Sequence, residues 1–297
     1  MNGNTCNLQS PASKKAQSHW AGVWRQFRKN KGAMAGLIVV LLAILTALTI
    51  GFFVDYDEHV IRQNIPMRLQ PPSLEHPLGT DELGRDLMVR ILYGSRYSLA
   101  VGFGSVGIAA LIGIALGAFA GFYGGYKEDV VMRLTDIFAA IPGLLLGAVI
   151  VASLGASLTN LILALGLASI PQFVRITRAS VLTVRDQEYV EASWVIGLTG
   201  RKIIFSHILP NCLSPIIVTA TLQVAQNIIS ASAMSFLGLG VPAPDPEWGA
   251  LLSAGRSYMR THGYLTLFPG LSIMLIVLAL NLLGDGLRDA LDPKLKR

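Results

Sequence analysis

Uncharged apolar stretches alternate with shorter polar segments along the whole chain of 297 residues. A helix needs about 20 apolar residues to cross the hydrocarbon core of a bilayer. Residues 32–54 and 97–126 carry no charged side chain, and each stretch predicts one crossing.

Residues 137–174 are uncharged too, but they are too many for one helix, which rises about 1.5 Å per residue through a core of roughly 30 Å. The small and polar residues 153–160 predict a turn inside this stretch. We therefore expect two helices here, at about 135–154 and 158–178. Two more crossings are expected at about 212–235, before a run rich in Gly and Pro, and at about 265–284.

Six crossings place both chain ends on the same side of the membrane. With the N-terminus inside, the inner segments hold 17 of the 24 Lys and Arg residues, and the outer segments hold the other seven. Because cytoplasmic loops are enriched in Lys and Arg, this distribution predicts cytoplasmic termini and a cytoplasmic loop at 180–211.

The composition supports an all-α polytopic membrane protein. The chain is 52% hydrophobic and 14% charged, whereas soluble domains carry about 25% charge. The net charge of +6 does not indicate a nucleic-acid partner, since the basic residues flank the apolar spans. The predicted division is a basic cytoplasmic N-terminal tail (1–31), a first transmembrane helix (32–54), an extracytoplasmic loop (55–90), a core of five further transmembrane helices that includes the loop 180–211 (91–287), and a cytoplasmic tail (288–297).

Motifs for catalysis, metals and nucleotides are missing from the sequence. The two cysteines, Cys6 and Cys212, lie far apart, and no histidines stand in HExxH spacing. The GxGxxG formed by Gly102, Gly104 and Gly107 lies inside an apolar span, and no P-loop follows the GxxxxGK[ST] pattern. We expect no catalytic residues, no metal site and no cofactor bound by this chain.

The spans themselves carry signals for packing. Gly113, Gly117 and Gly121 recur every fourth residue, a spacing that lets helices approach closely in lipid. Pro142 and Pro171 each remove a backbone donor and predict a bend or a hinge. Almost no ionisable residue falls mid-span, which argues against transport powered by this chain alone.

Residues 187–211 predict a helix, a sharp turn and a second helix. Gln187 to Ile196 have a helix-compatible composition, and Gly197 is placed to end that helix in a left-handed cap. Thr199 is placed to cap a second short helix, and Pro210 suits the first turn of the next span.

This loop holds more apolar side chains than it can cover, namely Tyr189, Val190, Trp194, Val195, Ile196, Ile203, Ile204 and Phe205. An apolar patch on the water side of a membrane favours a partner. Folding back onto the membrane explains the patch equally well. Glu191 either pairs with a basic residue of a partner or faces solvent, and Ala192 and Ser193 are small enough for close docking.

The spacing within this loop resembles the coupling motif of ABC importer permeases. That motif reads Glu-Ala-Ala, three residues, Gly, nine residues, Ile, any residue, Leu, Pro. Here Glu191, Ala192 and Gly197 match, as do Leu209 and Pro210, while Ser193 and His207 replace Ala and Ile. The stretches 78–86, 235–240, 247–252 and 284–293 resemble the oligopeptide/dipeptide/nickel branch of this family, most closely the second permease subunit of dipeptide importers.

The resemblance implies a type I ABC importer permease fold in the bacterial cytoplasmic (inner) membrane. It also implies four partners besides lipid: a related second permease, two ABC ATPases that use ATP and Mg, and a periplasmic or lipid-anchored substrate-binding protein. The implied ATPase-coupling residues are Glu191, Ala192, Ser193, Gly197, His207, Leu209 and Pro210, and the implied docking patch is Tyr189, Trp194, Val195 and Ile196.

The implied activity is ATP-driven import of small, dipeptide-like peptides by alternating access, without catalysis in this chain. The same machinery in this branch serves nickel, metal chelates or glutathione. A self-contained channel or a secondary carrier is the alternative of a different class. It leaves the apolar loop unexplained.

The outer segments carry four acidic residues that we expect to contact the binding protein: Asp81, Asp86, Asp245 and Glu247. The acidic residues of the segment 55–90 do not follow the spacing of the calcium-binding EF-hand; they are Asp55, Asp57, Glu58, Asp81, Glu82 and Asp86. The plain alternative is that they stabilise the loops. Residues 284–289 are expected to be a helix end that leads into the tail.

Overall fold

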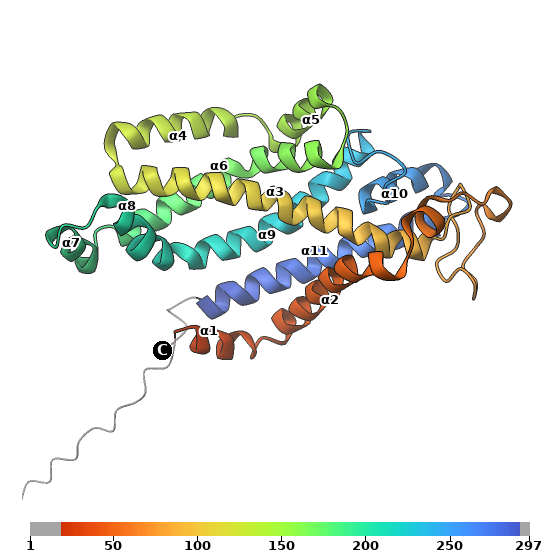
Figure 1. Ribbon diagram of the computed structural model, residues 1–297, viewed down its shortest axis with the longest axis horizontal. Helices are drawn as coiled ribbons and strands as arrows, with labels where there is room; N and C mark the ends of the chain where they lie inside the picture. The colour runs from red at the N-terminus through yellow and green to blue at the C-terminus, as the bar shows by residue number, and fades with distance from the viewer. Residues whose placement is uncertain (1–18, 292–297) are drawn as a thin grey trace, which may run out of the picture.

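Every regular element of the part that the structure describes, residues 19–291 of a computed structural model, is a helix (Figure 1). The elements are α1 (His19–Phe27), α2 (Lys31–Phe53), a π-helical turn (Tyr56–Ile61), a 3-10 turn (Ile65–Met67), α3 (Leu87–Tyr123), α4 (Gly125–Ala139), α5 (Gly143–Leu154), α6 (Leu158–Val184), α7 (Glu188–Val195), α8 (Gly200–Ile203), a π-helical turn (Ile204–Ile208), α9 (Leu209–Phe236), α10 (Trp248–Gly255), a 3-10 turn (Arg256–Tyr258) and α11 (Tyr264–Leu291).

The long helices run side by side and give the molecule two distinct ends (Figure 1). One end holds α7, α8, α1 and the last turns of α11, and we name it the hairpin end. The other end holds α10 and residues 54–86, and we name it the loop end.

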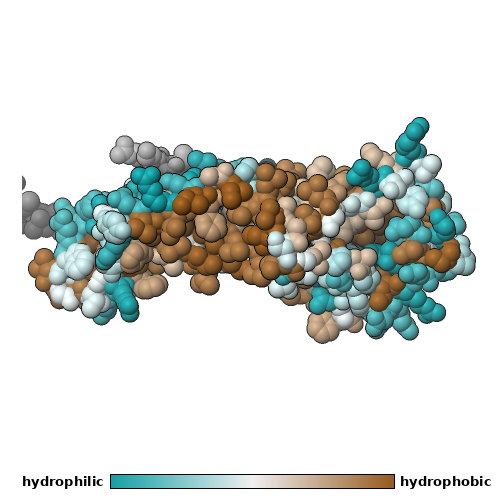
Figure 2. Space-filling view, turned by 90° about the horizontal axis from the view of Figure 1, so that it is seen from above, coloured by the Kyte–Doolittle hydropathy of each residue, from teal (hydrophilic) through white to brown (hydrophobic). Residues whose placement is uncertain are grey.

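Five helical segments are long and apolar enough to cross a membrane: α2, α3, α6, α11 and the continuous segment Gly200–Phe236 that contains α9. The pair α4 and α5 passes the same test together, although a bend of 79° separates the two helices. Figure 2 shows a hydrophobic belt around the middle of the molecule and hydrophilic side chains at both ends. The prediction of an all-α, multi-pass membrane protein is confirmed.

The third expected span is broken rather than continuous. Pro142 caps α5 with an extended backbone (φ −53°, ψ 128°), and α4 stops at Ala139. Proline removes one backbone donor and clashes with the preceding turn. Most side chains of α4 are exposed, so few neighbours are present to satisfy the carbonyls that a continuous helix would leave free. Pro171, in contrast, lies buried inside an unbroken α6.

Three other expected boundaries were wrong. The chain is already helical at His19–Phe27, within the expected N-terminal tail, because Val23 and Phe27 pack against Ala290 and Leu291 of α11. For the same reason α11 runs through residues 284–289 instead of ending there. Helix α3 begins at Leu87, within the expected outer loop, where the Asp86 side chain accepts a hydrogen bond from Val89 N. Cys6 and parts of the two expected tails, 1–18 of the tail 1–31 and 292–297 of the tail 288–297, lie outside the described residues.

Glycines set the close packing of α3 on α6. A Cβ atom built on Gly113 would lie 2.4 Å from Phe173 Cβ, and one built on Gly117 would lie 2.6 Å from the Val174 carbonyl oxygen. Neither contact is possible, so the two backbones approach only because these positions carry no side chain. Within lipid such close packing, rather than the hydrophobic effect, holds helices together.

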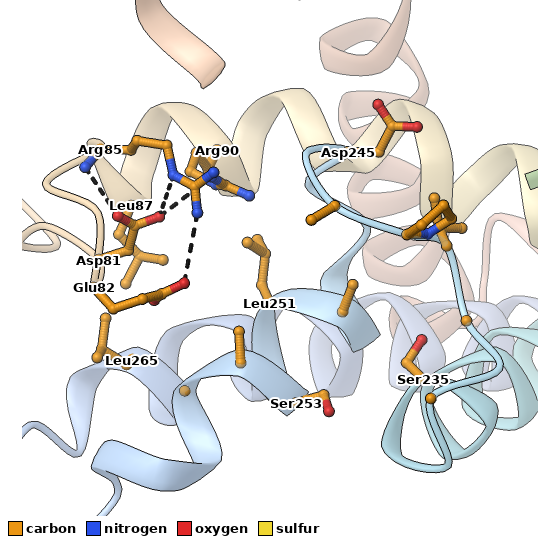
Figure 3. Close-up of a pocket in the computed structure, with 18 of the residues that line it drawn as sticks. Asp81, Glu82, Arg85, Leu87, Arg90, Ser235, Asp245, Leu251, Ser253 and Leu265 are labelled. Carbon is orange, nitrogen blue, oxygen red and sulfur yellow. Dashed lines mark hydrogen bonds and ion pairs between the residues drawn. The ribbon is translucent and has the colours of Figure 1, made fainter. Parts of the chain in front are cut away.

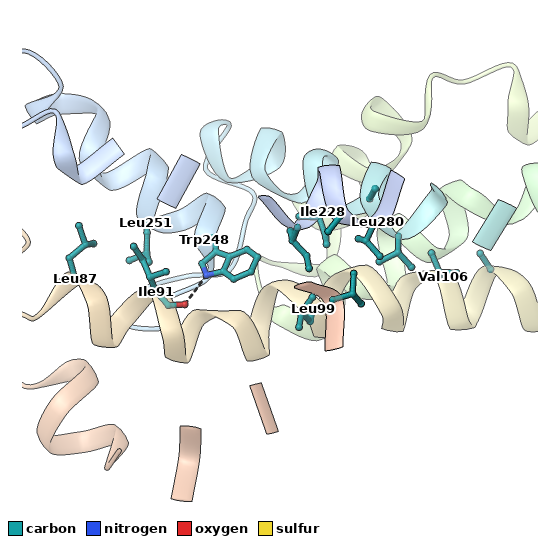
Figure 4. Close-up of a cluster of buried hydrophobic side chains, with 14 of the residues drawn as sticks. Leu87, Ile91, Leu99, Val106, Ile228, Trp248, Leu251 and Leu280 are labelled. Atoms are coloured by element: carbon teal, nitrogen blue, oxygen red, sulfur yellow. Dashed lines mark hydrogen bonds between the residues drawn. The ribbon is translucent and has the colours of Figure 1, made fainter. Parts of the chain in front are cut away.

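The main buried cluster follows α3 toward the loop end (Figure 4). Leu87, Ile91 and Leu99 of α3 pack there with Trp248 and Leu251 of α10. The Trp248 indole Nε1 donates to the Ile91 carbonyl oxygen at 2.8 Å. This buried donor therefore has a partner, and α10 is fixed against the start of α3.

Candidate functional site

The hairpin, which we define as α7, α8, the turn between them and the π-helical turn that follows (residues 188–208), has the predicted left-handed turn after its first helix. Gly197 has a φ of +80°, which L-residues rarely adopt. Its N–H donates to Trp194 O at 2.9 Å, and Leu198 N donates to Ser193 O at 3.1 Å. These two bonds form a Schellman motif, which ends α7 and satisfies its last carbonyls. The prediction that Gly197 ends the first helix in a left-handed cap is confirmed.

The second half of the hairpin differs from its prediction in one detail. Thr199 occupies the N-cap position of α8, but its side chain makes no capping hydrogen bond. Helix α8 has only four residues and continues through a π-helical turn into α9, where Pro210 stands in the first turn as predicted.

The apolar side chains of the hairpin divide into two sets. Val190, Ile203 and Ile204 are buried with Val181 of α6 and Ile208. Ser193 is buried as well, and its hydroxyl donates to the Tyr189 carbonyl oxygen at 2.7 Å. The remaining apolar side chains are exposed, namely Tyr189, Trp194, Val195, Ile196 and Phe205. The first set fixes the hairpin to the molecule, and the second set leaves a surface to be covered.

Most of that surface projects away from the molecule. The side chains of Val195 and Ile196 are 87% and 74% exposed. Trp194 is half-exposed and stacks on Phe122 of α3, with ring centroids 5.7 Å apart and an interplanar angle of 10°. Such a pair stabilises by about 0.5–1.5 kcal/mol beyond its buried area, so it holds α7 against α3.

The other expected coupling residues lie around this patch. Glu191 and Ala192 are exposed on α7, and Glu191 makes no ion pair or hydrogen bond through its side chain with any residue that the structure describes. His207 and Leu209 are partly exposed, and Pro210 is exposed. The residues of the expected motif therefore lie on α7, in the turn that ends it and around the start of α9.

The loop end is built in the opposite way, around buried charge (Figure 3). Asp81, Arg85 and Arg90 are all buried. Asp81 Oδ2 lies 2.7 Å from Arg85 Nε and 3.2 Å from Arg90 Nη1, while Asp81 Oδ1 accepts from Leu83 N and Arg85 N. Together with Glu82, which lies 3.6 Å from Arg85 Nη2, these residues form what we name the Asp81 cluster.

A cavity of about 360 Å³ lies beside this cluster, with Leu251 and Ser253 of α10 on its other side (Figure 3). Asp245 also lines it. Its carboxylate oxygen Oδ1 accepts from the hydroxyls of Tyr56 at 2.5 Å and Tyr97 at 3.0 Å. Burial and the hydrogen bond to Asp245 raise the pKa of the Tyr56 hydroxyl above its ordinary value.

Glu247 is fully buried and caps α10. One carboxylate oxygen accepts from Ser98 Oγ at 3.1 Å. The other accepts from Ser235 Oγ at 3.1 Å and from Ala250 N at 2.8 Å. Glu247 therefore joins α3, α9 and α10, and none of its acceptors points to solvent.

These positions correct part of the prediction for the outer acidic residues. Asp81 and Glu247 are buried and fully engaged inside the chain, so they are structural residues rather than contact residues in this state. Asp86 caps α3 and lies 2.7 Å from His76 Nδ1. Asp245 is partly exposed and already accepts two hydrogen bonds. The sequence reading missed Tyr56, Tyr97 and Ser98 as their partners, because these pairings join segments far apart in the chain.

Two family models match this chain. Residues 113–297 match the family model described as the binding-protein-dependent transport system inner membrane component. Residues 18–72 match the model described as the N-terminal TM domain of oligopeptide transport permease C.

Individual relatives match over most of the chain. The dipeptide transport system permease protein DppC of Alkalihalophilus pseudofirmus is 46% identical over 95% of this chain and 92% of that protein. The di/tripeptide transport system permease protein DppC of Pseudomonas aeruginosa is 46% identical over 92% of this chain and 91% of that protein. The glutathione transport system permease protein GsiD of Pectobacterium atrosepticum is 42% identical over 95% and 94%.

A solved structure of the MetNI methionine ABC transporter, in an inward facing conformation, matches with a TM-score of 0.56 and 20% identity. The match covers 69% of this chain and 98% of that chain, and it establishes a shared fold. The chain therefore belongs to the family of inner membrane components of binding-protein-dependent transport systems, and it is a multi-pass permease subunit with the type I ABC importer fold.

Proposed function

We propose that this subunit imports small peptides, that it works beside a second, related permease chain, and that two ABC ATPases drive it through the hairpin. The single observation that carries the substrate is the similarity to permeases named for dipeptides and tripeptides, at 46% identity over more than nine tenths of the chain. A binding protein delivers the peptide to the loop end, which is then extracytoplasmic. The hairpin end is cytoplasmic.

The exposed patch supports the role of the hairpin. Val195, Ile196 and Phe205 would stand in water at the hairpin end. A groove on an ATPase would remove this area from water, which favours docking by about 25 cal/mol per Å². The Schellman turn at Gly197 and the buried residues Val190 and Ile203 hold the hairpin rigidly against the rest of the chain. Movement of the ATPases would therefore reach α6 and α9 directly.

ATP-driven closure of the ATPases would change the relative stability of two arrangements of the permease pair. In such a two-state switch each ligand favours the state that it binds more tightly. ATP and Mg act in the partner subunits, and this chain supplies only the contact surface and the path. Glutathione is the second candidate substrate, because relatives named for glutathione transport are 42% identical to this chain.

The experiment is a pull-down of the tagged chain from its native membranes in mild detergent. Gly197→Asp is compared with Gly155→Asp. Both glycines have positive φ (+80° and +89°) and open space around an added Cβ. Gly155 also has a ψ of 153°, close to a region that is essentially restricted to glycine, so the control substitution strains the backbone at least as much. Wild type and Gly155→Asp are expected to bring down an ATPase and a second permease, while Gly197→Asp loses the ATPase. Equal recovery from both variants would contradict the coupling role.

The substrate is tested separately with proteoliposomes that contain the purified complex and its binding protein. ATP-dependent uptake of labelled dialanine is expected, and excess unlabelled glutathione should compete weakly. Uptake of glutathione in preference to dialanine would replace peptide by glutathione as the substrate. Uptake without ATP would favour a channel or a secondary carrier.

A further inference from the structure

A polar stripe runs along one face of α9 in the middle of its span. Gln223, Gln226, Asn227 and Ser230 stand at positions i, i+3, i+4 and i+7, which fall on one face of a helix. Both Gln223 and Ser169, its neighbour on α6, lie near the midpoints of helices that cross the hydrophobic belt. Polar side chains at this depth are costly in lipid and usually mark a path or a site.

The inner half of the stripe is bonded within the chain through the amide nitrogens of Gln223 and Asn227, which leaves the Gln223 amide oxygen without a donor among the described residues. Asn227 is 2% exposed, and its Nδ2 donates to Ser105 Oγ of α3 at 2.7 Å. Gln223 Nε2 donates to Asn227 Oδ1 at 2.9 Å and lies 3.2 Å from Ser169 Oγ. This network ties α3, α6 and α9 together. It also fixes the amide group of Gln223 at the surface of the helix group.

The outer half of the stripe is open. Gln226 is exposed and Ser230 is partly exposed, and neither side chain makes a hydrogen bond with any residue that the structure describes. Both line a cavity of about 340 Å³, together with Ser169, Gln223 and Gly143, which follows the break between α4 and α5. An amide left in hydrocarbon without a partner costs several kcal/mol, so this face meets water or protein and not lipid chains.

The chemistry of the lining identifies what passes over it. No residue that lines this cavity is ionisable, and its polar groups are amides and hydroxyls that both donate and accept. These groups match the main-chain amide of a peptide, which also donates and accepts. They do not select a charged side chain, so contact with the main chain alone would admit peptides of varied sequence.

We propose that Gln223, Gln226 and Ser230 form a contact surface on the transport path, where they hydrogen-bond to the peptide groups of a substrate in transit. Asn227 is a positioning residue, because it acts only by holding Gln223. This inference rests on the proposed function for its substrate, peptides, but not for the location of the path.

A measurement of dialanine uptake tests the proposed contact between Gln226 and the peptide. Gln226→Leu removes the free amide, and Thr49→Val removes a hydroxyl from α2 that does not line the cavity and bonds to Leu45 O. The loss of one or two hydrogen bonds predicts about a tenfold drop in dialanine uptake for Gln226→Leu. Thr49→Val should transport like wild type. Equal recovery of ATPase and second permease with both variants shows that each one is folded and assembled.

The accessibility of position 226 to an aqueous thiol reagent tests the location of the transport path without relying on the substrate. In a chain whose two native cysteines are replaced by alanine, Gln226→Cys is expected to react with a membrane-impermeant cationic methanethiosulfonate in the assembled transporter, at a rate that changes with ATP. Thr49→Cys should not react. Reaction of Gln226→Cys in a transporter that takes up no dialanine would support the path and overturn the peptide substrate. No reaction, with oxidative cross-linking of Gln226→Cys to a cysteine introduced into the second permease, would overturn the proposal and make the stripe a subunit interface.

Discussion

The two ends of this molecule differ in where they place their charged and apolar side chains. At the loop end, Asp81, Arg90 and Glu247 are buried and paired within the chain. At the hairpin end, Val195 and Ile196 stand exposed without a covering neighbour. A surface that satisfies its own groups is complete, whereas a surface that leaves apolar side chains in water is suited to a partner. The hairpin end is therefore where we expect a permanent partner.

The largest expected effect is a loss of folding stability when the Asp81 cluster at the loop end is disrupted. Asp81→Ala leaves two buried guanidinium groups, those of Arg85 and Arg90, without their shared carboxylate. Removing one partner of a buried ion pair typically costs about 3–5 kcal/mol. The thermal unfolding temperature of the purified chain in detergent should fall accordingly. Glu75→Ala, at an exposed carboxylate in the same loop, is the matched control and should change stability by less than about 0.5 kcal/mol. Equal unfolding temperatures for the two variants would contradict the internal role of Asp81.

A smaller loss is expected at the cap of α10. Glu247→Leu leaves the Ser98 hydroxyl and Ala250 N–H without their acceptor, while the Ser235 hydroxyl can still donate to the Ala231 carbonyl oxygen, and the change should cost about 2–3 kcal/mol. Glu247→Gln keeps one acceptor oxygen, and we expect it to lose about half as much. The same unfolding measurement compares the two variants. Equal losses of stability in the two variants would show that side-chain volume, and not hydrogen bonding, matters at position 247.

Tyr56 gives a weaker effect that depends on pH. Tyr56→Phe removes one hydrogen bond to Asp245 and should cost about 1 kcal/mol at neutral pH. Since the folded state raises the pKa of this hydroxyl, its stabilisation is complete below the ordinary value of 10.0 and is lost as the pH rises above it. The difference between wild type and Tyr56→Phe should therefore shrink when unfolding is measured above pH 10. A constant difference would contradict this hydrogen bond.

The smallest effects are expected where the hairpin departs from the family motif. Ser193→Ala loses only a hydroxyl bonded within its own helix, and His207→Ile changes a partly exposed side chain that makes no hydrogen bond or ion pair with the described residues. Each should change stability by no more than about 0.5–1 kcal/mol. Both variants should retain the ATPase in a pull-down. Its loss would mean that these two residues are specific contacts.

The hairpin and the loop end also differ in what the sequence alone predicts. The hairpin is local: Gly197, Pro210 and the spacing between them follow one another in the chain, and its turn was predicted correctly. The spans were predicted from uncharged runs in the same way. The pairings of Glu247 with Ser98 and of Asp245 with Tyr56 join segments about 150 or more residues apart, and only the folded chain brings them together.

Pro142 and Pro171 also show that tertiary contacts decide what a local sequence signal produces. Pro142 and Pro171 looked alike in the sequence, each inside an apolar stretch. The difference lies in their neighbours, since α6 is packed against α3, α5 and α9 while α4 has few contacts along its length. A broken span at Pro142 therefore depends on tertiary packing that a sequence pattern does not contain. The same break opens the cavity beside Gln226.

The most direct test exchanges one exposed apolar residue at each end for aspartate. Val195 of α7 and Leu74 of the outer loop are 87% and 102% exposed, so neither substitution should affect folding. The account predicts that Val195→Asp loses the ATPase in a pull-down from native membranes, whereas Leu74→Asp retains it in wild-type amount. Retention of the ATPase by Val195→Asp would contradict the claim that the hairpin is the docking surface, and loss from both variants would contradict the division between the two ends.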